Sequence, residues 1–218
     1  MRKITFILFV MVLVSLSSYA QDNQASNSSM DFNKWQVRLR GIVVAPNESA
    51  TIEAIGGDVD ISTSVVPELD FTYFFTEHWA AELILGTTKH DVEAVSTAAG
   101  DIDLGSVWLL PPTLTAQYHF TGGALKPYLG AGINYTIFYG VDEGPTADDV
   151  TYDNSFGFAL QAGLDYDLND KWFINVDLKK LFLNTTATVD ATTALGATVD
   201  ADVDIDPLII GVGIGMRF

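Results

Sequence analysis

Charged side chains recur at two-residue spacing within segments that otherwise alternate between apolar and polar residues. Arg38 is followed by Arg40, and Asp177 by Lys179. Residues two apart in a β-strand point to the same face, so these charges would share one side of a sheet. Buried charges of opposite sign must pair, so the predicted chemistry is an ion-pair network. We call this candidate network the plug; it comprises Arg38, Arg40, Asp70, Glu82, Asp165, Asp177, Lys179 and Arg217.

Enzymatic chemistry has little support in the sequence. The chain has three His residues, and neither G-x-S-x-G nor H-E-x-x-H occurs. His90, Asp91 and Ser96 form only a weak constellation for a nucleophile and its base. No spacing typical of a zinc, haem or EF-hand site is present. We therefore expect no catalytic residue, no bound metal and no cofactor.

Large apolar residues occupy the same strand faces as the charged residues, further along each segment. If the strands close into a membrane barrel, as their pattern indicates below, this apolar character of the inward face is unusual, because the lumen of such a barrel is ordinarily polar. The pattern favours an apolar funnel that binds hydrophobic solutes, and a dry, packed core is the alternative. Glycines between these residues would either leave a cavity or permit tight coiling of the strands. The candidate ligand-binding residues are Ile42, Val44, Val66, Ile84, Val107, Leu109, Phe138, Leu181, Leu183 and Ile209.

The N-terminus has the pattern of a signal peptide. Arg2 and Lys3 precede an apolar run, and a small-x-small cleavage site ends at Ala20. The run is shorter than the ~20 residues that a membrane-spanning helix needs. The chain thus divides into a signal peptide (1–20), a short periplasmic tail (21–33) and one further domain (34–218). The net charge of −17 argues against binding to nucleic acid, and the chain has no Cys with which to form disulfides.

Eight segments with period-2 alternation must position the charged and apolar faces. They lie near residues 34–45, 64–76, 79–90, 105–120, 126–140, 154–167, 172–184 and 205–218. Tight turns alternate with long, acidic connections that lack Lys and Arg, at 46–63, 91–104, 141–153 and 185–204. The predicted fold class is all-β: an eight-stranded antiparallel transmembrane β-barrel with short periplasmic turns and four long extracellular loops. The acidic connections fit a solvated surface or, alternatively, a divalent-cation belt facing lipopolysaccharide. Within them 58–61, 101–104 and 202–205 have the pattern of strands that continue above the membrane.

The faces opposite the charges are apolar, which indicates contact with lipid. In the last strand the even positions from Leu208 to Phe218 are large and apolar, whereas the odd positions include three glycines and Arg217. Aromatic residues near the tight turns predict an interfacial girdle. Its predicted members are Trp35, Tyr73, Trp79, Tyr118, Phe120, Tyr128, Tyr166, Trp172 and Phe218.

Four separated motifs resemble the OmpW family, in family order. The first two are Pro111-Pro112-Thr113-Leu114 with Gln117-Tyr118-His119-Phe120, and the segment Lys126–Thr136. The other two are Trp172–Lys180 and Asp206-Pro207, the latter followed by Gly211, Gly213, Gly215 and Arg217-Phe218. The resemblance implies an eight-stranded barrel in the outer membrane of a Gram-negative bacterium, which helps small hydrophobic molecules to cross.

These observations give one functional hypothesis and one alternative. In the hypothesis, an apolar funnel is open to the outside, closed below by the plug, and releases solutes sideways into the membrane. Pro67, Pro111 and Pro112 flank the third strand; because Pro cannot donate to a ladder, they mark either a lateral gap or strand ends. The alternative is a non-transporting barrel for envelope stability, adhesion, or phage or bacteriocin recognition. The expected partners are outer-membrane lipid, lipopolysaccharide, small hydrophobic solutes and the outer-membrane assembly machinery.

Overall fold

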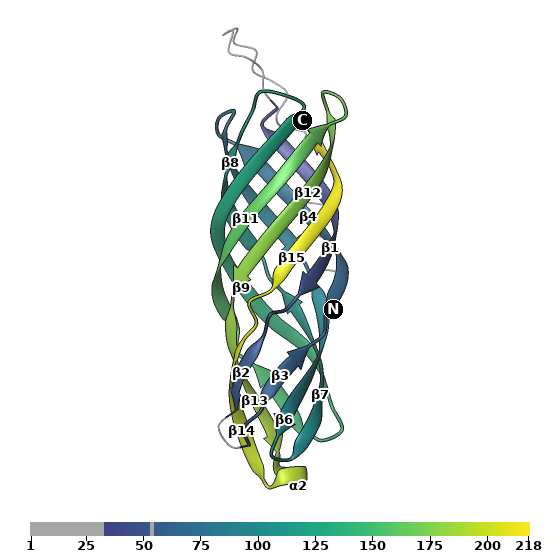
Figure 1. Ribbon diagram of the computed structural model, residues 1–218, viewed down its shortest axis with the longest axis vertical. Coiled ribbons are helices and arrows are strands. Elements are labelled where there is room, and N and C mark those ends of the chain that lie inside the picture. The colour runs from purple at the N-terminus through teal and green to yellow at the C-terminus, as the bar shows by residue number, and fades with distance from the viewer. Residues whose placement is uncertain (1–32, 53–54) are drawn as a thin grey trace, which may run out of the picture. The chain divides into compact units, whose positions relative to one another are not determined.

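Eight antiparallel strands form a closed barrel (Figure 1). The computed structural model describes residues 33–52 and 55–218, so the predicted signal peptide and nearly all of the predicted tail lie outside the described residues. The last strand pairs with the first from Gln36↔Arg217 to Ala45↔Leu208, which closes the ring. The predicted fold class is confirmed. In order around the ring the strands are β1 (Trp35–Ala45), β4 (Ser64–Phe74), β5 (Trp79–Gly86), β8 (Thr113–His119), β9 (Leu125–Glu143), β11 (Ser155–Asp167), β12 (Trp172–Phe182) and β15 (Leu208–Arg217).

The long connections are themselves largely strands, and they extend the barrel beyond the ring at the lower end of Figure 1. Within the barrel, "above" and "upper" mean toward this extension, and "below" and "lower" mean toward the tight turns. Their acidic residues alternate with apolar ones: Val92 and Ala94 are buried, whereas Asp91 and Glu93 are exposed. This alternation lets the strands cover an apolar interior and keep their charges in water. The elements of this extension are β2 (Ser49–Ile52), β3 (Asp58–Ile61), β6 (Thr88–Thr97), β7 (Gly100–Leu110), β10 (Asp149–Tyr152), β13 (Asn184–Ala191), the short helix α2 (Thr192–Leu195) and β14 (Ala197–Asp204).

Two separate sheets make up the extension. The upper part of β9 pairs with β7, which continues to β6 and β3, whereas β10, β13, β14 and β2 form a second sheet. The β9–β11 ladder ends at Thr136↔Ser155, and no ladder joins the rest of β9 to β10 among the described residues. The extension is therefore two facing sheets with a seam between β9 and β10.

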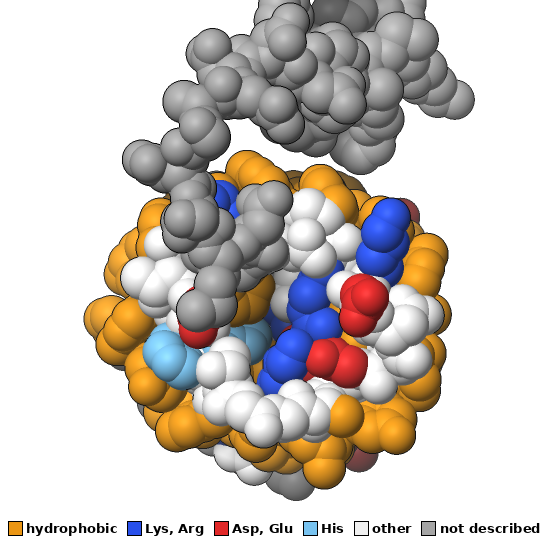
Figure 2. Space-filling view, turned by 90° about the horizontal axis from the view of Figure 1, so that it is seen from above, with side chains coloured by type: hydrophobic (Ala, Val, Ile, Leu, Met, Phe, Trp, Pro, Cys, Tyr) orange, Lys and Arg blue, Asp and Glu red, His pale blue; other side chains and the backbone are white. Residues whose placement is uncertain are grey.

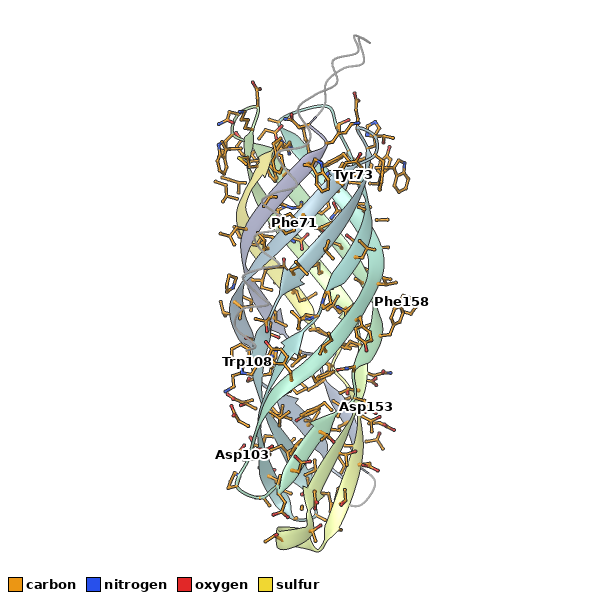
Figure 3. The ribbon with its side chains drawn as sticks, turned by 180° about the vertical axis from the view of Figure 1, so that it is seen from behind. Phe71, Tyr73, Asp103, Trp108, Asp153 and Phe158 are labelled. Atoms are coloured by element: carbon orange, nitrogen blue, oxygen red, sulfur yellow. The ribbon has the colours of Figure 1, made fainter. Side chains whose placement is uncertain are left out.

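The outer wall of the ring is apolar. Leu39, Phe156 and Val212 are more than half exposed, at 55%, 58% and 56%. Figure 3 shows Phe158 pointing away from the barrel and Tyr73 near the tight-turn end. Most of the predicted girdle lies on this wall, but the prediction for Tyr128 is wrong, because its side chain is only 1% exposed. Tyr128 lies on the inward face of β9, where even-numbered residues alternate with exposed Leu129 and Ile133.

No helix in the described part of the chain is long and apolar enough to cross a membrane.

Candidate functional site: an apolar cavity above an ion-pair network

Arg38 is the centre of the plug. Its side chain is fully buried, and its neighbours come from three other strands of the ring. Nε donates to Oδ1 of Asp70 at 2.8 Å, Nη2 donates to Oε1 of Glu82 at 2.5 Å, and Nη1 lies 3.7 Å from Oδ1 of Asp165. One guanidinium thus links β1 with β4, β5 and β11 across the lumen.

Arg40, the next inward residue of β1, extends the network upward. Its Nη2 lies 2.9 Å from Oδ2 of Asp70, and its Nε lies 2.9 Å from Oε1 of Glu68. Lys179 on β12 donates to both carboxylate oxygens of Glu68, at 2.6 and 2.7 Å. Its Nζ also lies 3.4 Å from Oδ1 of Asp177. The Glu68–Lys179 pair forms the upper surface of the plug.

Arg217 ends the network on the tight-turn side. Its Nη1 donates to Asp167 at 2.5 Å, Nη2 lies 3.4 Å from Asp165, and the guanidinium carbon lies 4.2 Å from the ring centre of Phe173. From this end, Figure 2 shows basic and acidic side chains inside a ring of hydrophobic ones. All eight residues predicted for the plug therefore meet in one chain of contacts drawn from six strands.

Glycines make room for the large side chains of the plug. A Cβ at Gly163 would lie 2.2 Å from Cζ of Tyr128, and one at Gly215 would lie 2.1 Å from Cζ of Phe173. A real Cβ atom essentially never lies within 3.0 Å of a heavy atom of another residue. At these positions the small residues accommodate neighbouring rings and leave no empty space. Each glycine is part of the packing of the lower lumen.

Several inward polar residues belong to the network but are absent from the predicted plug, and Glu68, Tyr128 and Gln161 are examples. Glu68 bridges Arg40 and Lys179. The Tyr128 hydroxyl donates to Oδ2 of Asp177 at 2.7 Å, and Nε2 of Gln161 donates to the same atom at 2.9 Å. The signal that identifies them is the alternation itself, because each has the parity of its strand's other inward residues.

An apolar cavity of about 110 Å³ lies directly above the plug. A single water needs roughly 10–15 Å³ of such space, so the cavity is too large to be a packing defect. All of the predicted ligand-binding residues line it except Val66, which is half-buried and packs against Ile42, Val44 and their neighbours. Lys179 and Glu68 lie at its lower boundary.

The extension lengthens this cavity well beyond the predicted funnel. The predicted continuation of 58–61, 101–104 and 202–205 as strands agrees with β3, β7 and β14. Apolar residues from both sheets line the cavity here, and the predicted ligand-binding set omits most of them because it draws only on the eight ring segments. They include Ile52, Val59, Val92, Ala94, Leu104, Ala187, Val199 and Val203.

The weak nucleophile–base constellation does not assemble. His90 lies within β6 and is buried, and its Nδ1 is 2.6 Å from the carbonyl oxygen of Ser62. Its Nε2 is 3.0 Å from Oγ1 of Thr88. Burial lowers the pKa of His90 below 6.5, so the imidazole is held neutral between these two partners. Across residues 33–52 and 55–218, no group of three or more Asp, Glu or His side chains is placed to hold a metal ion.

A sequence model of the OmpW family matches residues 33–218. The chain belongs to the OmpW family. It is 47% identical over 186 residues to an uncharacterized outer-membrane protein, y4mB, of Sinorhizobium fredii, a match that covers 84% of this chain and 80% of that protein. It is 34% identical to the dibenzothiophene metabolism operon protein PahQ of Pseudomonas aeruginosa, covering 89% of this chain and 93% of the relative.

The fold agrees with this family assignment. The crystal structure of the outer membrane protein OprG from Pseudomonas aeruginosa matches this OmpW-family chain with a TM-score of 0.79 at 28% identity. The match covers 86% of this chain and 96% of OprG. The protein is thus an outer-membrane β-barrel, as its sequence predicts.

Proposed function

We propose that this barrel helps small hydrophobic molecules to cross the outer membrane. A solute enters the apolar cavity from outside, stops at the plug and leaves sideways into the lipid. The observation that carries this proposal is the apolar wall, which runs through the upper ring and the extension in a position where barrel lumens are ordinarily polar. An extension of this length would let a solute pass the lipopolysaccharide layer inside the protein.

The energies favour a sideways exit over a straight passage. Burial of apolar surface stabilises a solute by roughly 25 cal/mol per Å², so the cavity attracts it from water. To continue downward, the solute must separate Lys179 from Glu68 and then Arg40 from Asp70, all of which are buried. Breaking one buried ion pair costs about 3–5 kcal/mol. Lipid offers the solute an apolar environment without that cost.

An interruption in the backbone hydrogen-bond ladder supports an exit between β4 and β5. Their ladder ends at Glu68↔Gly86, and the next backbone hydrogen bond above it runs from Ser62 N to Asp91 O, at 3.0 Å. Pro67, which cannot donate, lies in this gap. Val65 beside it is 73% exposed on the outer wall. The gap therefore adjoins both the lumen and the lipid-facing surface.

The name of one relative agrees with this substrate class. PahQ is named for an operon of dibenzothiophene metabolism, and dibenzothiophene is a flat, apolar aromatic compound. A barrel of similar sequence would need to accept such a molecule if it assists uptake.

Charges placed in the cavity wall test the proposal. Leu109 and Ile209 are 7% and 5% exposed and line the cavity from β7 and β15. We expect Leu109→Asp and Ile209→Asp to reduce naphthalene uptake by cells to the level of a strain that lacks the protein. Leu109→Met and Ile209→Leu, which keep the wall apolar, are the matched controls and should retain uptake. Unchanged uptake by folded Asp variants would contradict the proposal.

A reversible cross-link tests the exit. Extending the Glu68↔Gly86 register by two residues puts Val66 opposite Thr88. Because the chain has no Cys, the pair Val66→Cys/Thr88→Cys would carry the only thiols. We expect oxidation to stop uptake and reduction to restore it. The control pair Leu83→Cys/Leu114→Cys lies on the outer wall and joins strands that are already laddered, so its oxidation should change nothing.

The alternative of a non-transporting barrel makes the opposite prediction in both experiments. Neither wall charges nor the oxidised cross-link would alter uptake, and deletion of the protein would leave naphthalene uptake unchanged.

A further inference from the structure

Two aromatic rings meet in the cavity at the seam between the two sheets of the extension. Phe138 is on β9 and Tyr152 on β10, and their ring centres are 5.5 Å apart with an interplanar angle of 18°. Both residues line the apolar cavity. No ladder joins these parts of β9 and β10, and the two rings form a side-chain contact across the seam between them.

The Tyr152 hydroxyl differs from neighbouring polar groups in the cavity wall. Thr136 donates to Oδ1 of Asn134 at 2.7 Å, and Thr185 donates to the carbonyl oxygen of Asp153 at 2.7 Å. His90 is held by Ser62 and Thr88, as described above. Among the described residues, Tyr152 has no hydrogen-bond partner for its hydroxyl. Burial raises the pKa of Tyr152 to about 12, so the phenol keeps its proton at neutral pH and remains a donor.

We propose that Phe138 and Tyr152 form a selectivity site for flat aromatic solutes that carry one hydrogen-bond acceptor. The solute ring packs against the stacked pair, and the Tyr152 hydroxyl donates to the acceptor atom. This inference rests on the proposed function and adds the substrate class to it.

The chemistry of the wall limits what the site can recognise. Tyr152 is half-buried in a cavity wall that is mostly apolar, and an acceptor on the solute would give its hydroxyl a hydrogen-bond partner inside the cavity. A solute that carries additional donors would lose their hydration, because the residues that line the cavity are mostly apolar. A single neutral hydrogen bond corresponds to about a two- to tenfold preference.

The test compares quinoline with naphthalene, two flat bicyclic molecules that differ by one ring nitrogen acceptor. Initial uptake rates of both are measured at low concentration in a strain that lacks the protein, complemented with each variant. Tyr152→Phe removes the hydroxyl and keeps the stacked ring. Tyr135→Phe, on the outward face of the same strand as Phe138, is the matched control. The uptake of the uncomplemented strain is subtracted from each rate, so that the ratio of the two remaining rates does not depend on how much barrel folds.

We expect Tyr152→Phe to lower the quinoline-to-naphthalene ratio by about two- to tenfold, with naphthalene uptake unchanged, and Tyr135→Phe to leave the ratio as in the wild type. A ratio that is the same in Tyr152→Phe and the wild type overturns the selectivity site while leaving the proposed function in place. If the wild-type barrel accelerates uptake of neither compound, the proposed function fails and the inference fails with it.

Discussion

Replacing Arg38 with Met should be among the most destabilising changes in the barrel. Arg38 is fully buried and holds Asp70 at 2.8 Å, Glu82 at 2.5 Å and Asp165 at 3.7 Å. Methionine fills part of the space without a charge. The three carboxylates then stay buried with fewer cations between them.

The size of the effect follows from which contacts survive. Asp70 and Glu82 keep Arg40, at 2.9 and 3.3 Å, and Asp165 keeps Arg217 at 3.4 Å. Removing one partner of a buried pair costs about 3–5 kcal/mol, because an uncompensated charge remains. We therefore expect Arg38→Met to lower the free energy of unfolding by about 3–5 kcal/mol.

Urea unfolding of the barrel refolded into lipid vesicles, followed by tryptophan fluorescence, measures this change. The matched control is Lys89→Met, which breaks the exposed pair between Nζ of Lys89 and Asp142, 3.2 Å apart with side chains 41% and 74% exposed. Exposed pairs contribute about 0–1 kcal/mol, so the control should unfold nearly as the wild type does. The double variant Arg38→Met/Glu82→Gln should recover part of the loss, because it removes one surplus charge.

Two outcomes would refute this reasoning. One is a cost for Arg38→Met as small as that for Lys89→Met. The other is a double variant less stable than Arg38→Met alone, which would mean that surplus buried charge is not the source of the cost.

Two further predictions concern packing and pH. Gly215→Ala should lower the free energy of unfolding by about 1–3 kcal/mol in the same urea assay, because the new Cβ would lie 2.1 Å from the Phe173 ring. In the control Gly41→Ala the new Cβ meets nothing within 4 Å, so the free energy of unfolding should change by less than about 0.5 kcal/mol. Burial in the folded extension lowers the pKa of His90 below 6.5. As the pH falls below 6.5, the unfolded chain therefore binds a proton at His90 before the folded chain does, and the free energy of unfolding decreases. Urea midpoints measured from pH 7.5 to 5 should therefore decline less in His90→Asn than in the wild type; parallel curves would contradict the assignment.

Alternation along the strands was enough to predict the ring and the face of most site residues. A two-residue period determines which side a residue takes, and this places Arg38, Arg40 and Ile42 together on the inside of β1. The same rule applied to β4 gives Glu68, between Val66 and Asp70. The sequence therefore carries the signal that places Glu68 on the inward face.

Other features depend on contacts between distant segments and have no local signal. The residue type of Tyr128 and its position near a turn predict a place in the girdle, yet its hydroxyl bonds to Asp177, 49 residues further along the chain. Within the acidic connections only 58–61, 101–104 and 202–205 are predicted as strands, because charge dominates the composition of the rest. Buried residues outside these stretches, such as Val92 and Ala187, gain stability only when two sheets face each other, which is a property of the tertiary structure. The Phe138–Tyr152 contact likewise arises from the seam between β9 and β10.

The central claim, that a hydrophobic solute occupies the inside of the barrel, is tested most directly by two neighbouring residues of β15. Ile209 faces the cavity and is 5% exposed, whereas Ile210 faces lipid and is 50% exposed. Nuclear Overhauser effects from naphthalene protons to labelled isoleucine methyl groups can be recorded in nanodiscs of deuterated lipid. The account predicts a clear effect at Ile209 that is lost in Leu109→Asp, with any effect at Ile210 unchanged. Contacts at Ile210 with none at Ile209 would mean that the solute dissolves in the lipid without entering the barrel, and would contradict the account.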